Sequence, residues 1–200
     1  MSTVVVLDYG SGNLRSAERA LARAGAEVIV TSDLGLAAEA DGLVVPGVGA
    51  YAACMAGIDG LGAADVVRKR VADQRAVLGI CVGMQVLFER GDEHGDVTTG
   101  IGVLPGAVTR LGAPVLPHMG WNTVNPGPGS ALFTGLSDAW FYFVHSYAAH
   151  DTAGIVTTAT HGERFVAAVE SGSVAATQFH PEKSGDAGAQ LLANWMETLT

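Results

Sequence analysis

The feature that most constrains the fold is a short apolar run that ends in a glycine-flanked cysteine. Residues 77–80 read Val-Leu-Gly-Ile, Cys81 follows, and residues 82–88 read Val-Gly-Met-Gln-Val-Leu-Phe. The pattern Gly-x-Cys-x-Gly is typical of a nucleophile elbow, in which a strand turns sharply into a helix and holds the nucleophile strained and exposed. The positive end of the helix dipole favours the thiolate. We therefore interpret Cys81 as a candidate nucleophile, the alternative being an inert buried thiol.

A candidate base and a carboxylate lie far along the chain from Cys81. Pro181 separates His180 from Glu182 and disfavours helical geometry at His180. In an extended segment, residues two apart project to the same side, so Glu182 can orient the His180 ring while the other ring nitrogen faces Cys81. The sequence thus predicts a catalytic triad of Cys81, His180 and Glu182.

A glycine-containing loop upstream is a candidate oxyanion hole. Residues 43–45 read as a short buried strand that runs into Pro-Gly-Val-Gly at residues 46–49. The two glycines permit backbone conformations that bring amide N–H groups close to a ligand. An ordinary strand-end turn is the alternative. The candidate oxyanion donors are the amides of Gly47, Val48, Gly49 and Val82.

These three segments, in this order, resemble the oxyanion loop, nucleophile elbow and His-x-Glu pair of class I glutamine amidotransferases. The elbow carries Val82 where the family leads us to expect leucine, a difference of one methylene that leaves the chemistry untouched. The resemblance implies hydrolysis of glutamine to glutamate and ammonia through a Cys81 thioester, with no cofactor. It also implies that glutamine is held by Gln85, Ser146 and Tyr147. Gln85 could equally be an amide on a helix surface.

Three further segments resemble one branch of the family, the glutaminase subunits of imidazole glycerol phosphate synthases. They are residues 8–16, residues 117–122 and residues 143–147. The resemblance implies a heterodimer with a separate (β/α)₈ cyclase subunit, which uses the ammonia to make imidazole glycerol phosphate and an aminoimidazole carboxamide ribotide in histidine biosynthesis. A chain of 200 residues that folds as a glutaminase leaves no room for such a barrel.

Residues 117–122 are also the candidate docking surface for that partner. Exposed Trp and Met are typical interface anchors, so we expect Met119, Trp121 and Asn122 at the interface. A Trp buried in a strand is the alternative. The β-branched Val48 between two hinge-capable glycines suggests a further hypothesis, that partner binding completes the oxyanion hole.

Composition agrees with a globular enzyme of this kind. With 48% hydrophobic and 16% charged residues, the chain is expected to form one domain over residues 1–200. A formal net charge of −9 argues against nucleic acid as a partner. The N-terminus lacks the basic region of a signal peptide, and no apolar stretch reaches membrane-spanning length, so we expect no membrane association. Two cysteines, of which Cys54 is interpreted as structural, suggest a reducing compartment and a cytoplasmic location. The scattered histidines suggest no metal site.

The order of predicted elements indicates an α/β fold. In the first half, strands expected at residues 3–8, 27–31, 43–45 and 76–80 alternate with helices expected at 14–24, 65–74 and 82–89. In the second half, short β-like runs are expected at 107–110, 121–124, 140–144, 155–158, 166–170 and 174–177, before a terminal helix over 185–199. We therefore predict a central mixed, mostly parallel sheet with helices on both faces and an antiparallel extension in the C-terminal half.

Three other functions remain open at this stage. A glutaminase serving guanylate, anthranilate or pyridoxal phosphate synthesis is disfavoured by residues 8–16 and 117–122. A stand-alone cysteine hydrolase acting on γ-glutamyl amides would use the same triad without a partner. A non-enzymatic binding protein of the same fold would leave an intact triad idle.

Overall fold

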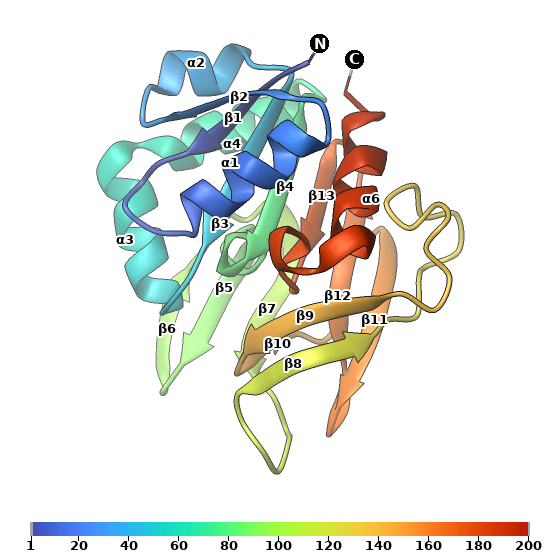
Figure 1. The fold of residues 1–200 in the computed structure, drawn as a ribbon. Coiled ribbons are helices and arrows are strands. Elements are labelled where there is room, and N and C mark those ends of the chain that lie inside the picture. The colour runs from blue at the N-terminus through green and yellow to red at the C-terminus, as the bar shows by residue number, and fades with distance from the viewer. Residues whose placement is uncertain (1, 200) are drawn as a thin grey trace.

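A seven-stranded sheet forms the centre of the molecule (Figure 1). The structure, a computed structural model, describes residues 2–199. The strand order is β11-β12-β13-β4-β3-β1-β2. The five parallel strands are β1 (Thr3–Leu7), β2 (Glu27–Thr31), β3 (Gly42–Gly47), β4 (Ala76–Cys81) and β13 (Val174–Thr177). The two antiparallel strands that extend the sheet are β12 (Glu163–Ser171) and β11 (Ile155–His161).

The three central strands, β3, β4 and β13, are buried on both faces. Every residue of β3 and β13 is buried, as are five of the six residues of β4. This explains why their sequences are continuous apolar runs and not alternations of apolar and polar residues. Burial on both faces requires helices above and below the sheet.

Helices cover both faces, as Figure 1 shows. On one face α1 (Leu14–Arg23) packs beside α6 (Gly185–Met196). On the other face lie α3 (Tyr51–Leu61) and α4 (Ala63–Ala72), and α2 (Leu34–Glu39) packs against α4. The predicted fold class, with its mostly parallel sheet and antiparallel extension, is confirmed.

Two smaller sheets complete the fold. One has the order β10-β7-β5-β6, and the other is an antiparallel ribbon of β8 and β9. Their strands are β5 (Phe88–Glu93), β6 (Asp96–Thr99), β7 (Leu104–Arg110), β8 (His118–Thr123), β9 (Trp140–His145) and β10 (Tyr147–Ala149). The runs expected at 107–110, 121–124 and 140–144 are therefore strands, but they lie in these smaller sheets and do not extend the central one.

The helix expected over residues 82–89 is shorter than predicted. Helix α5 spans only Val82–Gln85, and the chain is already a strand at Phe88. Phe88 is fully buried and pairs with Leu104, so tertiary packing overrides the helical tendency of the segment. Helix α3 was not predicted, because its two glycines lower the helix propensity of an otherwise apolar run.

Three strand ends bring the predicted motifs to one edge of the central sheet. Strands β3, β4 and β13 are parallel neighbours, so their carboxyl ends lie together. The oxyanion loop follows β3, the elbow follows β4, and the His-x-Glu segment follows β13, where Pro181–Lys183 form a short 3-10 helix, η1. In open α/β sheets, ligands bind outside the carboxyl ends of the strands.

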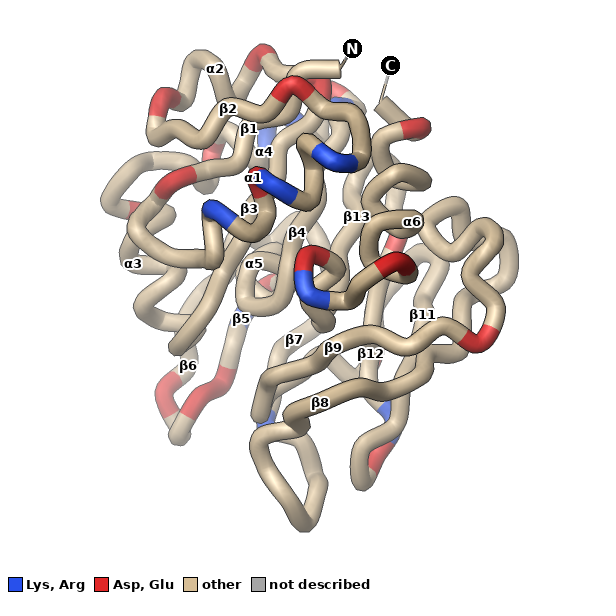
Figure 2. Tube along the Cα trace, viewed as in Figure 1, with Lys and Arg blue, Asp and Glu red and all other residues tan. Residues whose placement is uncertain are grey.

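Charge is distributed with an acidic excess. Figure 2 shows Asp and Glu residues spread around the molecule, with several at the turn between β5 and β6. The formal net charge of −9 is opposite in sign to the positive charge of a surface that binds a phosphate backbone. Over residues 2–199, no helix has both the length and the apolar character required to cross a bilayer.

The elbow packs against β3 through close backbone contacts. A Cβ atom at Gly83 would lie 1.9 Å from the Val45 carbonyl oxygen, and one at Gly79 would lie 2.8 Å from the Gly83 carbonyl oxygen. Real side chains do not tolerate such contacts with backbone atoms, so both positions require glycine. The Gly-x-Cys-x-Gly pattern is therefore a packing requirement at the centre of the fold.

We expect Gly83→Ala to lower the free energy of unfolding by about 3 kcal/mol or more, because the methyl group must displace backbone of the central sheet. Gly60→Ala is the matched control: Gly60 lies in α3, and a Cβ there would meet nothing within 4 Å. That change should raise the free energy of unfolding by about 0.5–1 kcal/mol. Urea unfolding followed by circular dichroism measures both, and equal effects would contradict the packing requirement.

Candidate active site

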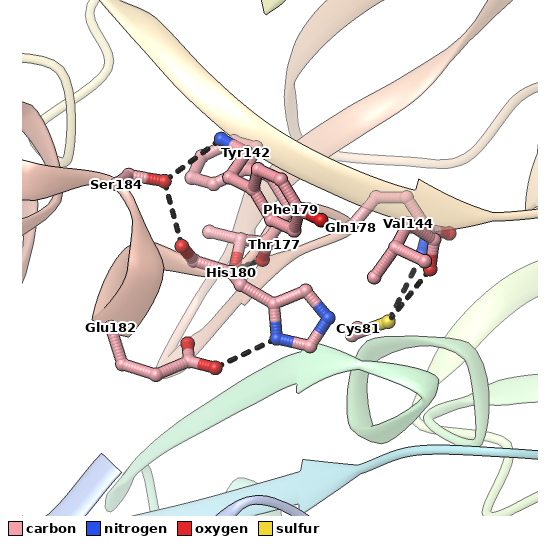
Figure 3. A network of polar contacts seen from close by, with 9 residues as sticks. All are labelled: Cys81, Tyr142, Val144, Thr177, Gln178, Phe179, His180, Glu182 and Ser184. Carbon is pink, nitrogen blue, oxygen red and sulfur yellow. Dashed lines mark hydrogen bonds and ion pairs between the residues drawn. The ribbon is translucent and has the colours of Figure 1, made fainter. Parts of the chain in front are cut away.

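Cys81 occupies a strained turn between β4 and α5. Its backbone has φ 56° and ψ −114°, a region that non-glycine residues rarely adopt and that costs of order 1–3 kcal/mol. The packing of Gly79 and Gly83 holds the strain in place. The Sγ atom lies 3.9 Å from the Val144 carbonyl oxygen and 3.8 Å from Gln178 Nε2 (Figure 3). The residue is 2% exposed, so its thiol is presented to a cavity and not to bulk water.

His180 and Glu182 form a buried pair beside Cys81. His180 Nδ1 lies 2.7 Å from Glu182 Oε1, and both side chains are almost fully buried. His180 has the extended backbone geometry that the sequence predicts, but Pro181–Lys183 form the 3-10 helix η1, so Glu182 does not lie in an extended segment. In Figure 3 the other ring nitrogen, Nε2, points toward Cys81, and it has no hydrogen-bond partner among the described residues. The ring is therefore oriented on one side and open toward the thiol on the other.

The electrostatics of this pair favour a charged imidazole. Burial lowers the pKa of His180, but the interactions of the ring with Cys81 and with Glu182 outweigh burial and raise the pKa to about 9. At neutral pH the ring therefore carries a proton on both nitrogens. A protonated histidine next to a cysteine stabilises the thiolate, the nucleophilic form of the thiol.

Ser184 anchors the backbone of His180 to the ribbon. The Ser184 hydroxyl donates to the His180 carbonyl oxygen at 2.7 Å and accepts from the Tyr142 N–H at 3.0 Å. Figure 3 shows these two bonds of the Ser184 hydroxyl, and the His180 N–H also donates to the Tyr142 carbonyl oxygen at 2.9 Å. The sequence signals Ser184 only as a serine directly before a helix, the usual N-cap position. Its side chain instead fixes the catalytic segment to β9.

Gln178 is a second residue that the sequence motifs missed. Its side chain is fully buried and connects Cys81 to the predicted substrate residues. Gln178 Oε1 accepts from Gln85 Nε2 at 2.9 Å, and the same Gln85 nitrogen donates to the Tyr147 carbonyl oxygen at 2.8 Å. Gln85 is 3% exposed, so the interpretation of Gln85 as a helix-surface amide is wrong.

A cavity of about 210 Å³ opens in front of Cys81. It gathers the candidate nucleophile, the candidate base and the three predicted substrate residues at one place. Its lining also includes Val48, Gly49, Val82, Glu93, Val144, His145 and Lys183. A cavity of this size accommodates a small molecule. Among residues 2–199, no group of three or more His, Cys, Asp and Glu side chains is arranged to hold a metal ion.

The candidate oxyanion loop reaches the cavity, but one of its amides is engaged elsewhere. Gly47 pairs with Cys81 in the β3–β4 register, and Gly49 and Val82 line the cavity. The Val48 N–H, by contrast, donates to the Ser11 hydroxyl at 3.3 Å. In this conformation Val48 does not supply the oxyanion donor that the sequence predicts.

The β8–β9 ribbon exposes large apolar side chains. Met119 is 62% exposed, Trp121 is 53% exposed, and Trp140 on the neighbouring strand is 56% exposed. The interpretation of Trp121 as a buried strand residue is therefore wrong. Asn122 alternates to the other face, where its Nδ2 donates to the Thr160 carbonyl oxygen at 3.0 Å. The Asn122 side chain is thus hydrogen-bonded within the protein, whereas the side chains of Met119 and Trp121, predicted with it, are exposed.

Two buried histidines connect the inner face of the ribbon to the cavity. Asn122 Nδ2 lies 3.2 Å from His118 Nε2, and His118 Nδ1 lies 3.0 Å from His145 Nε2. His145 Nδ1 lies 2.9 Å from the Tyr147 carbonyl oxygen, the same oxygen that Gln85 bonds. Burial lowers the pKa of His118 to about 4 and that of His145 to about 3, so both rings stay neutral. Because each neutral ring has one N–H donor and one acceptor nitrogen, the hydrogen bonds in this series all point the same way, from Asn122 toward the Tyr147 carbonyl oxygen.

We expect the His180 ring to titrate well above pH 6.5, whereas His118 and His145 do not titrate between pH 5 and 9. Ring ¹⁵N chemical shifts measure all three, and the two neutral rings serve as internal controls. Cys81→Ala and Glu182→Gln each remove a group that raises the pKa of His180, so each should lower it. A pKa at 6.5 or below in the unchanged protein would contradict the charged pair.

The raised pKa also predicts how stability depends on pH. Because the folded pKa of His180 lies above its unfolded value, its contribution to the free energy of unfolding is fully present below pH 6.5. The contribution is lost as pH rises toward about 9. Urea unfolding measures the free energy of unfolding at pH 6 and at pH 9, and the difference between the two values should be smaller in Glu182→Gln than in the unchanged protein. Equal differences would contradict this assignment.

Known proteins resemble this chain in sequence and in structure. The family model described as glutamine amidotransferase class-I matches residues 5–199. A protein of Mycobacterium tuberculosis described as imidazole glycerol phosphate synthase subunit HisH is 62% identical over 202 residues, covering 98% of each chain. A protein of Streptomyces avermitilis with the same description is 61% identical over 207 residues, covering 98% of this chain and 96% of its own length.

Solved structures show the same architecture. A crystal structure described as a glutamine amidotransferase is 25% identical, with a TM-score of 0.75, and the match covers 95% of this chain and 98% of that one. The strained cysteine elbow, the buried His–Glu pair and the small cavity are thus found in a chain whose relatives are described as HisH subunits of imidazole glycerol phosphate synthase. The chain therefore belongs to the class-I glutamine amidotransferase family, in the group of HisH subunits of imidazole glycerol phosphate synthase.

Proposed function

We propose that this chain hydrolyses glutamine through a Cys81 thioester and supplies the ammonia to a separate cyclase subunit that makes imidazole glycerol phosphate in histidine biosynthesis. The observation that carries the proposal is the orientation of His180, whose Nδ1 is held by Glu182 while its open Nε2 faces the Cys81 thiol. The descriptions of the relatives support the choice of pathway. The catalytic domain extends over residues 1–200, and the two terminal residues lie outside the described range.

The acylation step uses the charged pair. The Cys81 thiolate attacks the carboxamide carbon of glutamine and forms a carbon–sulfur bond, and the carbonyl oxygen becomes an oxyanion. His180 Nε2 then donates its proton to the amide nitrogen, the carbon–nitrogen bond breaks, and ammonia leaves. Glu182 stabilises the imidazolium before the transfer and holds the ring in place during it.

Deacylation uses the same ring in its neutral form. Having given up its proton, His180 Nε2 accepts one from water, and the hydroxide attacks the thioester carbon. The carbon–sulfur bond breaks, and the product leaves with a protonated γ-carboxyl group that ionises in solvent to give glutamate. The thiolate and imidazolium are restored together. The two steps therefore balance in protons without any other acid or base.

The remaining groups hold glutamine and its oxyanion. Gln85, Ser146 and Tyr147 line the cavity next to Cys81 and are suited to bind the substrate. The amide of Val82, directly after the nucleophile, and amides of the loop at residues 47–49 are the proposed oxyanion donors. Each such donor is commonly worth roughly 3–4 kcal/mol of transition-state stabilisation.

The partner is proposed to be a (β/α)₈ cyclase that docks on the β8–β9 ribbon and forms a heterodimer in the cytoplasm. Met119 and Trp121 offer exposed apolar area beside the strand that holds His180 through Tyr142. Exposed Met and Trp side chains are enriched at interfaces and frequently dominate binding energy. A partner docked here lies close to the cavity, so ammonia has a short path between the two subunits.

The function is tested by glutamate release from glutamine, measured on the chain alone and with the cyclase subunit and its ribulosyl ligand. We expect slow release alone, strong stimulation by the partner, and a loss of at least 10³-fold in Cys81→Ala. Equal rates with and without the cyclase would favour the stand-alone cysteine hydrolase. Activity that survives Cys81→Ala would exclude the proposed nucleophile.

The docking surface is tested separately by affinity. We expect Trp121→Ala and Met119→Glu each to weaken binding of the cyclase by roughly 10- to 100-fold, because each removes apolar contact area at the proposed interface. Leu36→Ala is the matched control, since Leu36 is also exposed but lies on α2, far from the ribbon in Figure 1. Isothermal titration calorimetry measures all three variants. Unchanged affinity in both ribbon variants would place the interface elsewhere.

A further inference from the structure

The sulfur of Cys81 has one hydrogen-bond acceptor and one hydrogen-bond donor beside it. The thiol donates to the Val144 carbonyl oxygen at 3.9 Å, and Gln178 Nε2 donates to the sulfur at 3.8 Å (Figure 3). When the thiol loses its proton, the first of these bonds ends. The second becomes a charge-assisted bond, which is stronger than a bond between neutral groups. Gln178 is therefore placed to stabilise the thiolate.

The orientation of the Gln178 side-chain amide follows from its neighbours. The Tyr147 carbonyl oxygen can only accept, so Gln85 presents its amide nitrogen to that oxygen, at 2.8 Å. The same nitrogen donates its second hydrogen to Gln178 Oε1 at 2.9 Å. The nitrogen of the Gln178 amide is thus left for the sulfur. A reversed amide would place its oxygen against the sulfur and bring two NH₂ groups together, so the observed orientation is fixed.

The backbone around Gln178 is also held in place. The Gln178 N–H donates to the Ala167 carbonyl oxygen of β12 at 2.8 Å. The next residue, Phe179, is fully buried, and its ring stacks on Phe141 with the ring centroids 4.2 Å apart. Gln178 and His180 therefore both reach the nucleophile, while the residue between them packs in the core.

The titratable groups of the cavity differ from Gln178 in how they meet the sulfur. Apart from the nucleophile, they are Glu93, His145, Tyr147, His180 and Lys183. Burial lowers the pKa of His145 to about 3, so this ring is neutral. His180 presents its open ring nitrogen to the sulfur, as Figure 3 shows, and this nitrogen is a donor only while it holds its proton.

An amide donor stays in place through both half-reactions of the proposed mechanism. His180 faces the sulfur with a proton before acylation, and without one after it has protonated the leaving ammonia. The Gln178 amide has no proton that titrates in this range, so its donor is unaffected by that transfer. Its N–H therefore still faces the sulfur when the carbon–sulfur bond breaks and negative charge returns to that atom.

We propose that Gln178 is a further catalytic residue, whose side-chain amide stabilises the Cys81 thiolate before acylation and the leaving thiolate during deacylation. The inference rests on the proposed glutaminase function and assigns a role to a residue outside the predicted triad. Gln85 then has a second role as a positioning residue, because its amide determines which end of the Gln178 amide faces the sulfur.

The first test is alkylation of Cys81 by iodoacetamide in the isolated chain, followed from pH 4 to pH 10 by mass spectrometry of the peptide that contains it. In Gln178→Met, the midpoint of the rise in rate with pH should move upward by about one unit, which is a roughly tenfold lower rate below the midpoint. The plateau rate at high pH should change by less than about twofold. A change that only disturbed packing would slow alkylation at every pH alike.

Gln190→Met is the matched control for this variant. Gln190 is exposed on α6, and its amide donates to Asn194 Oδ1 at 2.9 Å, so the change should leave the alkylation profile as it is. With saturating cyclase and its ribulosyl ligand, the acidic limb of kcat/KM for glutamine should move upward in Gln178→Met by the same amount as the alkylation midpoint.

The second test uses the unchanged side chain and needs no stable Gln178 variant. The side-chain amide proton of Gln178, observed by ¹⁵N-edited NMR, should shift downfield as the Cys81 thiolate forms. The shift should be absent in Cys81→Ala, which has no sulfur to accept the bond.

The outcomes separate this inference from the proposed function. An unmoved alkylation midpoint in folded Gln178→Met, or no amide shift in the unchanged chain, would overturn the role of Gln178. Glutamate release that depends on Cys81 would then still support the glutaminase proposal. A moved midpoint and an amide shift without any glutamine hydrolysis, with or without the cyclase, would instead overturn the proposed function and leave Gln178 as a donor to the thiolate.

Discussion

The strained backbone of Cys81 is the constraint on which the site depends. A non-glycine residue stays at φ 56° here because Gly79 and Gly83 let α5 press directly against β3. The same contact sets three things at once: the direction of the thiol, the start of α5 beside it, and the depth at which Gln85 enters the cavity. A bulkier residue at either glycine would separate α5 from the sheet and move all of them.

The polar groups around the cavity form a continuous set that leads back to the ribbon. From Asn122 the hydrogen bonds pass through two neutral histidines to the Tyr147 carbonyl oxygen, which also bonds Gln85. A second connection joins the ribbon to His180 through Tyr142 and Ser184. The ribbon therefore supports both the predicted substrate residues and the candidate base, although it lies outside the central sheet. The exposed face of the ribbon carries large apolar side chains, whereas its inner face carries these hydrogen bonds.

Features encoded by local spacing could be predicted from the sequence, and features that depend on distant contacts could not. Strands at 27–31 and 174–177 match the structure at both ends, because each is a short run rich in apolar and β-branched residues. The extended geometry of His180 follows from Pro181 alone. By contrast, the sequence around Phe88 does not indicate that this residue pairs with Leu104, so the helix expected over residues 82–89 is too long. The contacts of Ser11, Gln178 and Ser184 likewise appear only when separate strand ends meet.

The position of β13 in the sheet has a consequence for the order of folding. Gln178 follows Cys81 by 97 residues, and β13 pairs with β4 only after the ribbon and both antiparallel strands have been synthesised. Contacts between such distant segments form late, because closing a long loop costs conformational entropy before the new contacts can offset that cost. Until then, Cys81 has neither a neighbouring imidazole nor a closed cavity. In the proposed mechanism, Cys81 therefore gains its base, and with it nucleophilic reactivity, only when the sheet is complete.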